Sequence, residues 1–157
     1  MTDQALASDT TEPLGDAAEI ARLMGLPSWQ KMSSLSLVDQ IAQGLPLQAV
    51  ERVAQVMAPD DPRAKFTLLS RSTWSRLQKR PSQLLTRETS ERIHGIARVL
   101  LEARRLWAGD ESAMVRFLNR PHLLMDGRTP LDVARESTAG ADLVVRIIGE
   151  ARAGVAV

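Results

Sequence analysis

Few side chains in this sequence could carry out covalent or metal chemistry. The chain has no Cys, which excludes disulfides, thiolate nucleophiles and Cys-ligated zinc. Of the two histidines, His94 lies in an apolar helical pattern, where a packed or interface role is expected, and His122 follows Pro121 in a predicted turn. Four positions after His94 comes Arg98, which cannot be a second metal ligand. We therefore expect no catalytic residue, no metal site and no cofactor, and predict that the chain is not an enzyme.

Positive charge gathers in the middle of the chain. The net charge is only +1, but residues 71–105 contain nine Lys or Arg and three Glu, whereas residues 1–20 contain acidic residues and no basic one. Such a basic block can bind the phosphates of nucleic acid, and it can equally be the solvated face of an ordinary helix. Charge alone leaves both interpretations open.

The segment from Arg63 to Arg80 predicts a short helix, a tight turn and a second short helix, the arrangement of a helix-turn-helix. In the second helix, over residues 72–79, Trp74 and Leu77 should turn inward. Small hydroxyl side chains let a helix N-terminus approach the major groove, Arg can read guanine edges, and flanking cations can meet phosphates. The expected DNA-binding residues are Arg71, Ser72, Thr73, Ser75, Arg76, Lys79 and Arg80. The alternative to a DNA-binding helix is the solvated helix of an ordinary bundle. The turn also lacks the glycine that is usual in the helix-turn-helix motif.

The last third of the chain predicts a compact helical module without catalytic residue types. A short helix capped by Asp110 stops at Pro121, a turn with Gly127 follows, and Pro130 begins a further helix. A closing helix carries an apolar stripe that is expected to be core, formed by Val144, Ile147, Ile148 and Ala151. We expect this module to be bound by another molecule.

The remaining segments that position these parts also have helical patterns. Asp16 is expected to cap a short N-terminal helix, and a linker at about 28–34 follows it. A capping signal at Thr86 begins the longest predicted helix, about 88–108, which is apolar on more than one side. This pattern favours a central helix that joins two modules, with a dimer seam as the alternative. Of the tryptophans, Trp74 and Trp107 are expected in the core, and Trp29 is expected to dock on the bundle.

The fold class expected from these patterns is all-α, because no segment of useful length alternates with a period of two. No apolar run is long enough to span a membrane, and the N-terminus carries no signal-peptide pattern. These features predict a soluble cytoplasmic protein. Residues 1–15 are polar and acidic and are expected to be disordered.

From Gly44 to the C-terminus, an ordered series of short motifs resembles a known protein family. The series is Gly44-Leu45-Pro46, Ser72-Thr73-Trp74-Ser75-Arg76, Glu88-Thr89-Ser90-Glu91-Arg92, Ala97-Arg98, Trp107-Ala108-Gly109-Asp110, Phe117-Leu118-Asn119-Arg120-Pro121, Leu124, Gly127, Pro130-Leu131-Asp132, Gly140-Ala141, Val145 and Gly154-Val155. In order and spacing, these motifs resemble the Xre-type antitoxins of bacterial RES–Xre toxin–antitoxin pairs, which end in an Xre/MbcA/ParS toxin-binding domain. The chain departs from the family's pattern at Leu77, where a second Arg is common, and at Ala153, where an aromatic residue or His is common.

The resemblance implies an N-terminal Xre-like helix-turn-helix module joined by a long central helix to a small helical toxin-binding module. The expected parts are a flexible N-terminal segment with a short helix (1–34), an Xre-like DNA-binding domain (35–95) and a toxin-binding domain (96–157). The implied partners are operator DNA of its own operon, which the protein represses, and a RES-domain toxin that consumes NAD⁺; no membrane is involved. We also expect a homodimer, because the long helix has more apolar surface than one thin bundle needs and a symmetric protein suits a palindromic operator.

Toxin-binding residues are expected in two places, the loop after Pro121 and the extreme C-terminus. They are Leu124, Gly127 and Arg128 in the loop, and Arg152, Gly154, Val155, Ala156 and Val157 at the end. The tail is small, nearly uncharged and thin enough to enter a cleft, and its terminal carboxylate could take the place of a pyrophosphate oxygen. The alternative for the tail is a frayed chain end without a role. The alternative for the whole chain is a free-standing dimeric helix-turn-helix transcriptional regulator without a toxin partner.

Overall fold

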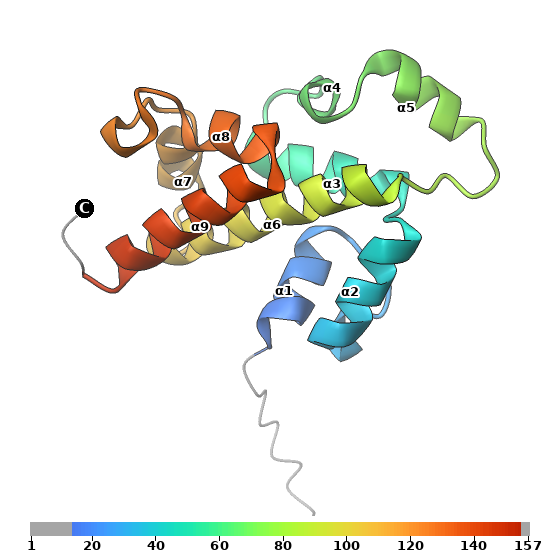
Figure 1. The fold of residues 1–157 in the computed structure, drawn as a ribbon, viewed down its shortest axis with the longest axis horizontal. Coiled ribbons are helices and arrows are strands. Elements are labelled where there is room, and N and C mark those ends of the chain that lie inside the picture. The colour runs from blue at the N-terminus through green and yellow to red at the C-terminus, as the bar shows by residue number, and fades with distance from the viewer. Residues whose placement is uncertain (1–13, 155–157) are drawn as a thin grey trace, which may run out of the picture.

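The computed structural model describes residues 14–154, and helices make up most of them (Figure 1). The elements are α1 (Asp16–Leu23), the 3₁₀ turn η1 (Trp29–Lys31), α2 (Ser34–Gln43), α3 (Leu47–Met57), α4 (Lys65–Leu68), α5 (Arg71–Gln78), α6 (Arg87–Leu106), α7 (Glu111–Leu118), the 3₁₀ turn η2 (Leu123–Met125), α8 (Pro130–Glu136) and α9 (Thr138–Arg152). Extended residues pair only at an isolated antiparallel bridge between Pro46 and Leu84 within this described range. The predicted all-α class is confirmed.

Side-chain caps decide where most of these helices begin. A hydroxyl or carboxylate oxygen accepts a backbone N–H of the first turn and so satisfies a donor that has no partner inside the helix. Such caps are Ser33 for α2, Ser70 for α5, Thr86 for α6, Asp110 for α7, Thr129 for α8 and Ser137 for α9. The expected cap at Asp16 is wrong, because Gly15 holds the cap position and Asp16 is the first residue of α1.

Helix α6 is the central element of the molecule (Figure 1). It packs against α1, α2 and α3 and also against α7, α8 and α9. Its residues Ile93, Ile96, Val99 and Leu100 are at most 2% exposed, so both apolar sides of the helix are covered by this chain. The prediction of a central helix is confirmed. We had also expected α6 to carry more apolar surface than this chain could cover, which suggested a dimer seam. Neighbouring helices of the same chain bury that surface instead.

The segment before α2 forms part of the same core. Met24 and Leu26 are almost fully buried, and Trp29 is half-buried against the core, as predicted. Of the other tryptophans, Trp74 is buried, but Trp107 is 39% exposed and the prediction that it lies in the core is wrong. Trp107 follows the last residue of α6, and its indole packs beside Phe117, which is itself only partly buried.

A network of charges joins the N-terminal helix to the end of the last one. Arg105 of α6 donates to Asp16 at 2.7 Å, to Glu102 at 3.0 Å and to Glu19. Glu102 also accepts a hydrogen bond from Arg152 of α9. The hydrogen bond that Arg105 donates to Asp16 is the main cause that raises the pKa of Arg105 above its ordinary value. These contacts hold α1 and the C-terminal end of α9 to the same turn of α6.

His94 lies where α6 meets α9. The environment of its imidazole ring allows us to predict how the stability of the folded protein changes with pH. Burial, and after it the positive charge of Arg98, lowers the pKa of His94 to about 4, against the opposing effect of Asp142. The unfolded chain therefore binds a proton at this site below about pH 6.5, while the folded protein does not until about pH 4. Stability should be lost as the pH falls through this window.

Thermal melts between pH 7 and pH 4.5 check this expectation. The melting temperature of the wild type should fall more steeply toward low pH than that of His94→Gln, which has no titrating ring. Arg98 and Asp142 form an ion pair with 2.6 Å between their charged atoms and stay unchanged in both proteins. Equal pH slopes for the two proteins would contradict the burial of a neutral histidine here.

Candidate binding surfaces

Helix α5 has the position and boundaries of the second helix in a helix-turn-helix. It begins at Arg71, one residue before the expected start, and the Ser70 hydroxyl caps it by accepting from the Thr73 amide at 3.3 Å. Leu69 and Ser70 connect α4 to α5, and both have negative φ values in the extended region. No residue of this turn needs the left-handed conformation, which explains why the turn can lack the usual glycine.

The outward face of α5 carries four of the predicted DNA-binding residues. Residues three, four and seven positions apart lie on one side of a helix, so Ser72, Ser75, Arg76 and Lys79 share a face, and all four are exposed. The opposite face holds Trp74 and Leu77, which are buried as predicted. The Ser72 and Thr73 hydroxyls lie within hydrogen-bond distance of the capping Ser70 hydroxyl, at 3.2 Å and 2.9 Å.

Aromatic and cationic side chains fasten α5 to the helices before it. The rings of Trp74 and Phe66 meet edge to face with 6.2 Å between their centroids. The Lys65 ammonium lies 4.5 Å from the Trp74 ring centroid and 3.0 Å from the Glu51 carboxylate of α3. The guanidinium of Arg71 lies over Phe66, 4.3 Å from the ring centroid. Arg71 therefore supports the turn, and its predicted DNA contact stays a prediction.

The three remaining predicted cations are free for an external partner. Arg76, Lys79 and Arg80 are exposed, and among residues 14–154 none of them forms an ion pair. An unpaired exposed cation can neutralise a phosphate without first breaking an internal contact. The arrangement therefore suits a helix that faces the phosphates and base edges of a duplex.

In the C-terminal part, the loop between α7 and α8 closes on itself through backbone hydrogen bonds. The His122 amide donates to the Arg128 carbonyl at 3.0 Å, and the Gly127 amide donates to the His122 carbonyl at 3.1 Å. The His122 Nδ1 accepts from the Leu124 amide at 3.3 Å, so the predicted loop or capping role of His122 is confirmed. Met125 is buried and anchors the loop.

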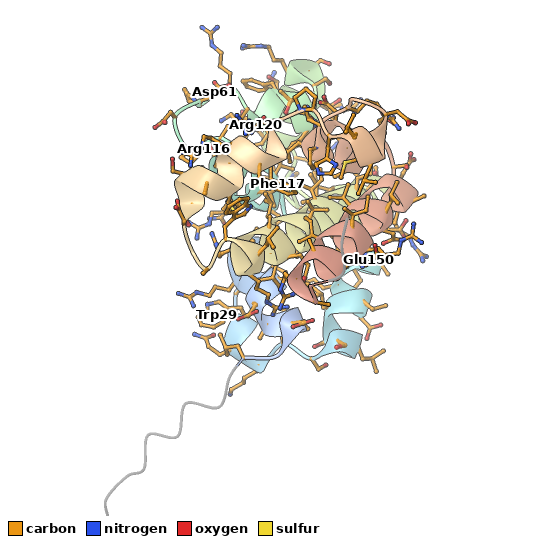
Figure 2. The ribbon with its side chains drawn as sticks, turned by 90° about the vertical axis from the view of Figure 1, so that its left-hand side faces the viewer. Trp29, Asp61, Arg116, Phe117, Arg120 and Glu150 are labelled. Carbon is orange, nitrogen blue, oxygen red and sulfur yellow. The ribbon has the colours of Figure 1, made fainter. Side chains whose placement is uncertain are left out.

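The same loop presents two leucines to solvent next to an aromatic surface. Leu123 is 94% exposed and Leu124 is 48% exposed. The Trp107 and Phe117 ring centroids are 6.1 Å apart, and those of Phe117 and His122 are 6.4 Å apart. We call Trp107, Phe117, Leu123 and Leu124 the aromatic–leucine surface. Figure 2 shows Phe117 on α7 with Arg116, and Arg120 just beyond the helix.

Only part of this surface was predicted from the sequence. Leu124 was expected to bind the partner, but Leu123, Trp107 and Phe117 were not. Three apolar residues in a row, Leu123 to Met125, carry no helical or strand period, so the sequence does not indicate which of them points inward. The useful signal was the pair of leucines directly after Pro121 and His122, where a loop was predicted.

The other predicted toxin-binding residues have mixed environments. Arg128 pairs with Glu136 at 2.8 Å and Arg152 pairs with Glu102, so both guanidiniums have partners inside the chain. Gly154 has a φ of +76° and its amide donates to the Ala151 carbonyl at 3.2 Å, which ends α9 with a left-handed residue that favours glycine. Val155, Ala156 and Val157 lie outside the described residues.

The two candidate surfaces lie at different ends of the molecule. In Figure 1, α5 stands at the right, whereas the α7–α8 loop and the end of α9 lie at the left. Helix α6 spans the distance between the two ends. One partner could therefore occupy α5 while another occupies the C-terminal part.

Two further findings concern other kinds of site. Across residues 14–154, no three His, Asp or Glu side chains are grouped so that they could hold a metal ion. In the same part of the chain, no helix is both long and apolar enough to cross a membrane.

Comparison with known families divides the chain within α6. Residues 36–98 match the family model of the antitoxin Xre-like helix-turn-helix domain. Residues 102–154 match the model of the antitoxin Xre/MbcA/ParS C-terminal toxin-binding domain. No curated protein and no solved structure matches the chain. Helix α5 lies within the first matched range, and the aromatic–leucine surface lies within the second.

Proposed function

Because the chain belongs to the Xre-type antitoxins of type II toxin–antitoxin systems, we propose that it silences a RES-domain toxin that consumes NAD⁺ and represses its own operon. The observation that carries the proposal is the pair of matched domains, whose candidate surfaces lie at different ends of one helical body (Figure 1). Both domains are regulatory antitoxin families, so the role of the chain is to bind rather than to catalyse.

The DNA-binding part of the proposal rests on α5. Its face of Ser72, Ser75, Arg76 and Lys79 enters the major groove, with Arg76 reading base edges and Lys79 and Arg80 meeting phosphates. The protein binds as a homodimer in the cytoplasm, because a palindromic operator is read by two symmetric copies. The DNA-binding domain corresponds to residues 35–95 and the toxin-binding domain to 96–157, with the boundary inside α6.

In the toxin-binding part of the proposal, one element docks on the toxin and another inhibits it. The aromatic–leucine surface docks on the toxin, because exposed aromatic and leucine side chains gain free energy when a partner removes them from water. The tail from Arg152 to the C-terminus then enters the cleft that binds NAD⁺. Gly154 has a φ of +76° and follows the last residues of α9, so the helix does not continue through it.

A co-expression experiment tests this function. The reading frame next to the gene should encode a RES-domain protein that arrests growth when expressed alone, with loss of cellular NAD⁺. Co-expression of this chain should restore both growth and NAD⁺, and the two proteins should purify together. A neighbouring product that is not a RES protein would contradict the toxin assignment. Absence of any partner, with operator binding intact, would favour the free-standing regulator.

Two substitutions directly after α5 should lower affinity for all DNA sequences alike. Lys79→Ala and Arg80→Ala each remove an exposed cation that has no ion-pair partner in the described chain, so each should release about one counterion fewer. The slope of log affinity against log salt should therefore become shallower by about one for each variant. Gel shifts with operator and unrelated DNA over a salt series measure this slope. An unchanged slope would place both side chains away from the duplex.

A further inference from the structure

Two adjoining hollows lie on the α1 side of the molecule, away from α5. One of about 560 Å³ is lined by α1, α3, α6 and the first residue of α7, and the other, of about 440 Å³, lies between η1, the turn before it and α3. Arg22 of α1 and Arg52 of α3 line both hollows. Both volumes fall in the range of about 300–1,000 Å³ that is typical of small-molecule sites. α1 and η1 lie outside both matched domain ranges, so Arg22 and Trp29 are not among the residues that the family models match.

The charges around the hollows are unbalanced. Glu19 and Glu111 are the carboxylates that line the larger hollow, and each already has a partner: Glu19 accepts from Arg105, and Glu111 pairs with Arg104 at 3.1 Å. Arg22 and Arg52 form no ion pair within residues 14–154. Among residues 14–154, none of those that line the smaller hollow is acidic. Two permanently charged guanidiniums therefore face the same space without a counter-charge from the described chain.

Packing holds these two guanidiniums in place. The Arg22 guanidinium lies over the Trp29 ring, 5.1 Å from its centroid. The Arg52 side chain crosses the turn after α1 so closely that a Cβ on Gly25 would lie 2.9 Å from Arg52 Cγ. Gly25 has a φ of +69°, so glycine is favoured here both for its backbone and for the space it leaves. Figure 2 shows Trp29 at the N-terminal side of the molecule, apart from Phe117 and α7.

We propose that these hollows form a binding site for a phosphate-bearing ligand of nucleotide size, with the phosphates between Arg22 and Arg52 and the base beside Trp29. A guanidinium offers a planar fork of N–H donors that matches two phosphate oxygens, and two such forks suit a pyrophosphate. The Trp29 ring and the guanidinium stacked on it provide the flat surface on which a base can lie. Ser28, Gln30 and Gln48 line the smaller hollow and supply neutral hydrogen-bonding groups for the rest of the ligand.

The position of the hollows favours a small ligand over a nucleic acid. In Figure 1, α1 lies below α6, whereas α4 and α5 lie above it. A duplex that contacts the exposed face of α5 would therefore approach from the other side of the molecule. Inorganic pyrophosphate, a free nucleotide and a nucleic acid all carry phosphate groups that could bind between the two guanidiniums. Titration with separate probes distinguishes these ligands.

The test uses the full chain and three probes, namely pyrophosphate, ADP and adenosine, measured by isothermal titration calorimetry. ADP should bind more tightly than pyrophosphate, and adenosine should not bind measurably. Arg22→Gln and Arg52→Gln remove only the charge from exposed side chains and should each weaken ADP binding by about tenfold or more, as expected for a charge-assisted hydrogen bond. Trp29→Phe should weaken ADP binding but leave pyrophosphate binding unchanged.

Two controls make the result decisive. Arg146→Gln removes an exposed charge from α9 and should bind ADP as the wild type does. Arg22→Gln and Arg52→Gln should bind operator DNA with unchanged affinity, and their circular dichroism should match the wild type. The proposal is overturned if neither pyrophosphate nor ADP binds at millimolar concentration, or if Arg146→Gln weakens binding as much as Arg52→Gln. Loss of operator binding in the Arg22 and Arg52 variants would also overturn it, in favour of a nucleic-acid contact.

Discussion

A chain that lacks residues 154–157 should still bind its toxin but should no longer protect NAD⁺. Under the proposed function, docking rests on the exposed aromatic–leucine surface, which this deletion leaves intact, whereas inhibition rests on the C-terminal tail, which the deletion removes. A cleft that binds a pyrophosphate is lined by cationic or N–H donor groups, and a thin chain segment that fills such a cleft would exclude NAD⁺. Pull-down of the toxin and the rate of NAD⁺ loss are measured separately on the same complex. Retained binding with restored NAD⁺ consumption is the expected result.

Two further variants separate the tail from the surface. Deletion of residues 155–157 keeps Gly154, which ends α9 at a φ of +76°, and should restore NAD⁺ consumption equally. Leu123→Asp changes a side chain that is 94% exposed, so it should leave the fold intact and lower toxin binding itself. Full inhibition by the truncated chain would move the inhibitory contact to the loop between Leu124 and Pro130.

Arg76→Ala should weaken operator binding by about 1–3 kcal/mol, or roughly tenfold to a hundredfold, and should relax the preference for one base. Arg76 is exposed in the middle of the outward face of α5, and its side chain has no ion pair within residues 14–154. A bidentate contact from this position to a guanine edge would be lost with the guanidinium. Fluorescence anisotropy with the operator and with single-base variants measures both effects.

Arg76→Lys is the matched variant for this prediction. Lysine keeps the positive charge and the salt dependence but lacks the planar fork, so discrimination between bases should fall while binding to unrelated DNA stays near wild type. Arg146→Ala, which changes an exposed residue of α9, should leave operator binding unchanged. Equal binding by Arg76→Ala and the wild type would show that α5 does not read the operator.

Local patterns in the sequence predicted most of the helices correctly. The caps at Thr86 and Asp110 lie where the sequence places them, because a hydroxyl or a carboxylate acts on the first turn of its own helix. The inward position of Trp74 and Leu77 also followed from helical spacing. The expected cap at Asp16 was wrong by one position, because α1 begins at Asp16 and Gly15 holds the cap position.

The errors concern residues whose environment depends on distant parts of the chain. Trp107 was expected in the core, but α6 ends just before it, and the helices that cover α6 leave the indole 39% exposed beside Phe117. The apolar faces of α6 suggested a dimer seam because apolar residues have the same pattern whether another helix or another subunit covers them. Only the packing of α1, α2 and α9 on α6 showed that this chain covers them itself.

The sequence alone determined the all-α class, the start of most helices and the exposed face of α5, because caps and helical periodicity act over a few residues. The tertiary structure decided which apolar residues remain exposed, such as Leu123, and which charges are paired, such as Arg152 with Glu102 of α6. It also decided that Arg22 and Arg52, thirty positions apart in the sequence, line the same hollows. These properties depend on which helices pack together, and that choice is made by long-range burial of apolar surface, which no local pattern reports.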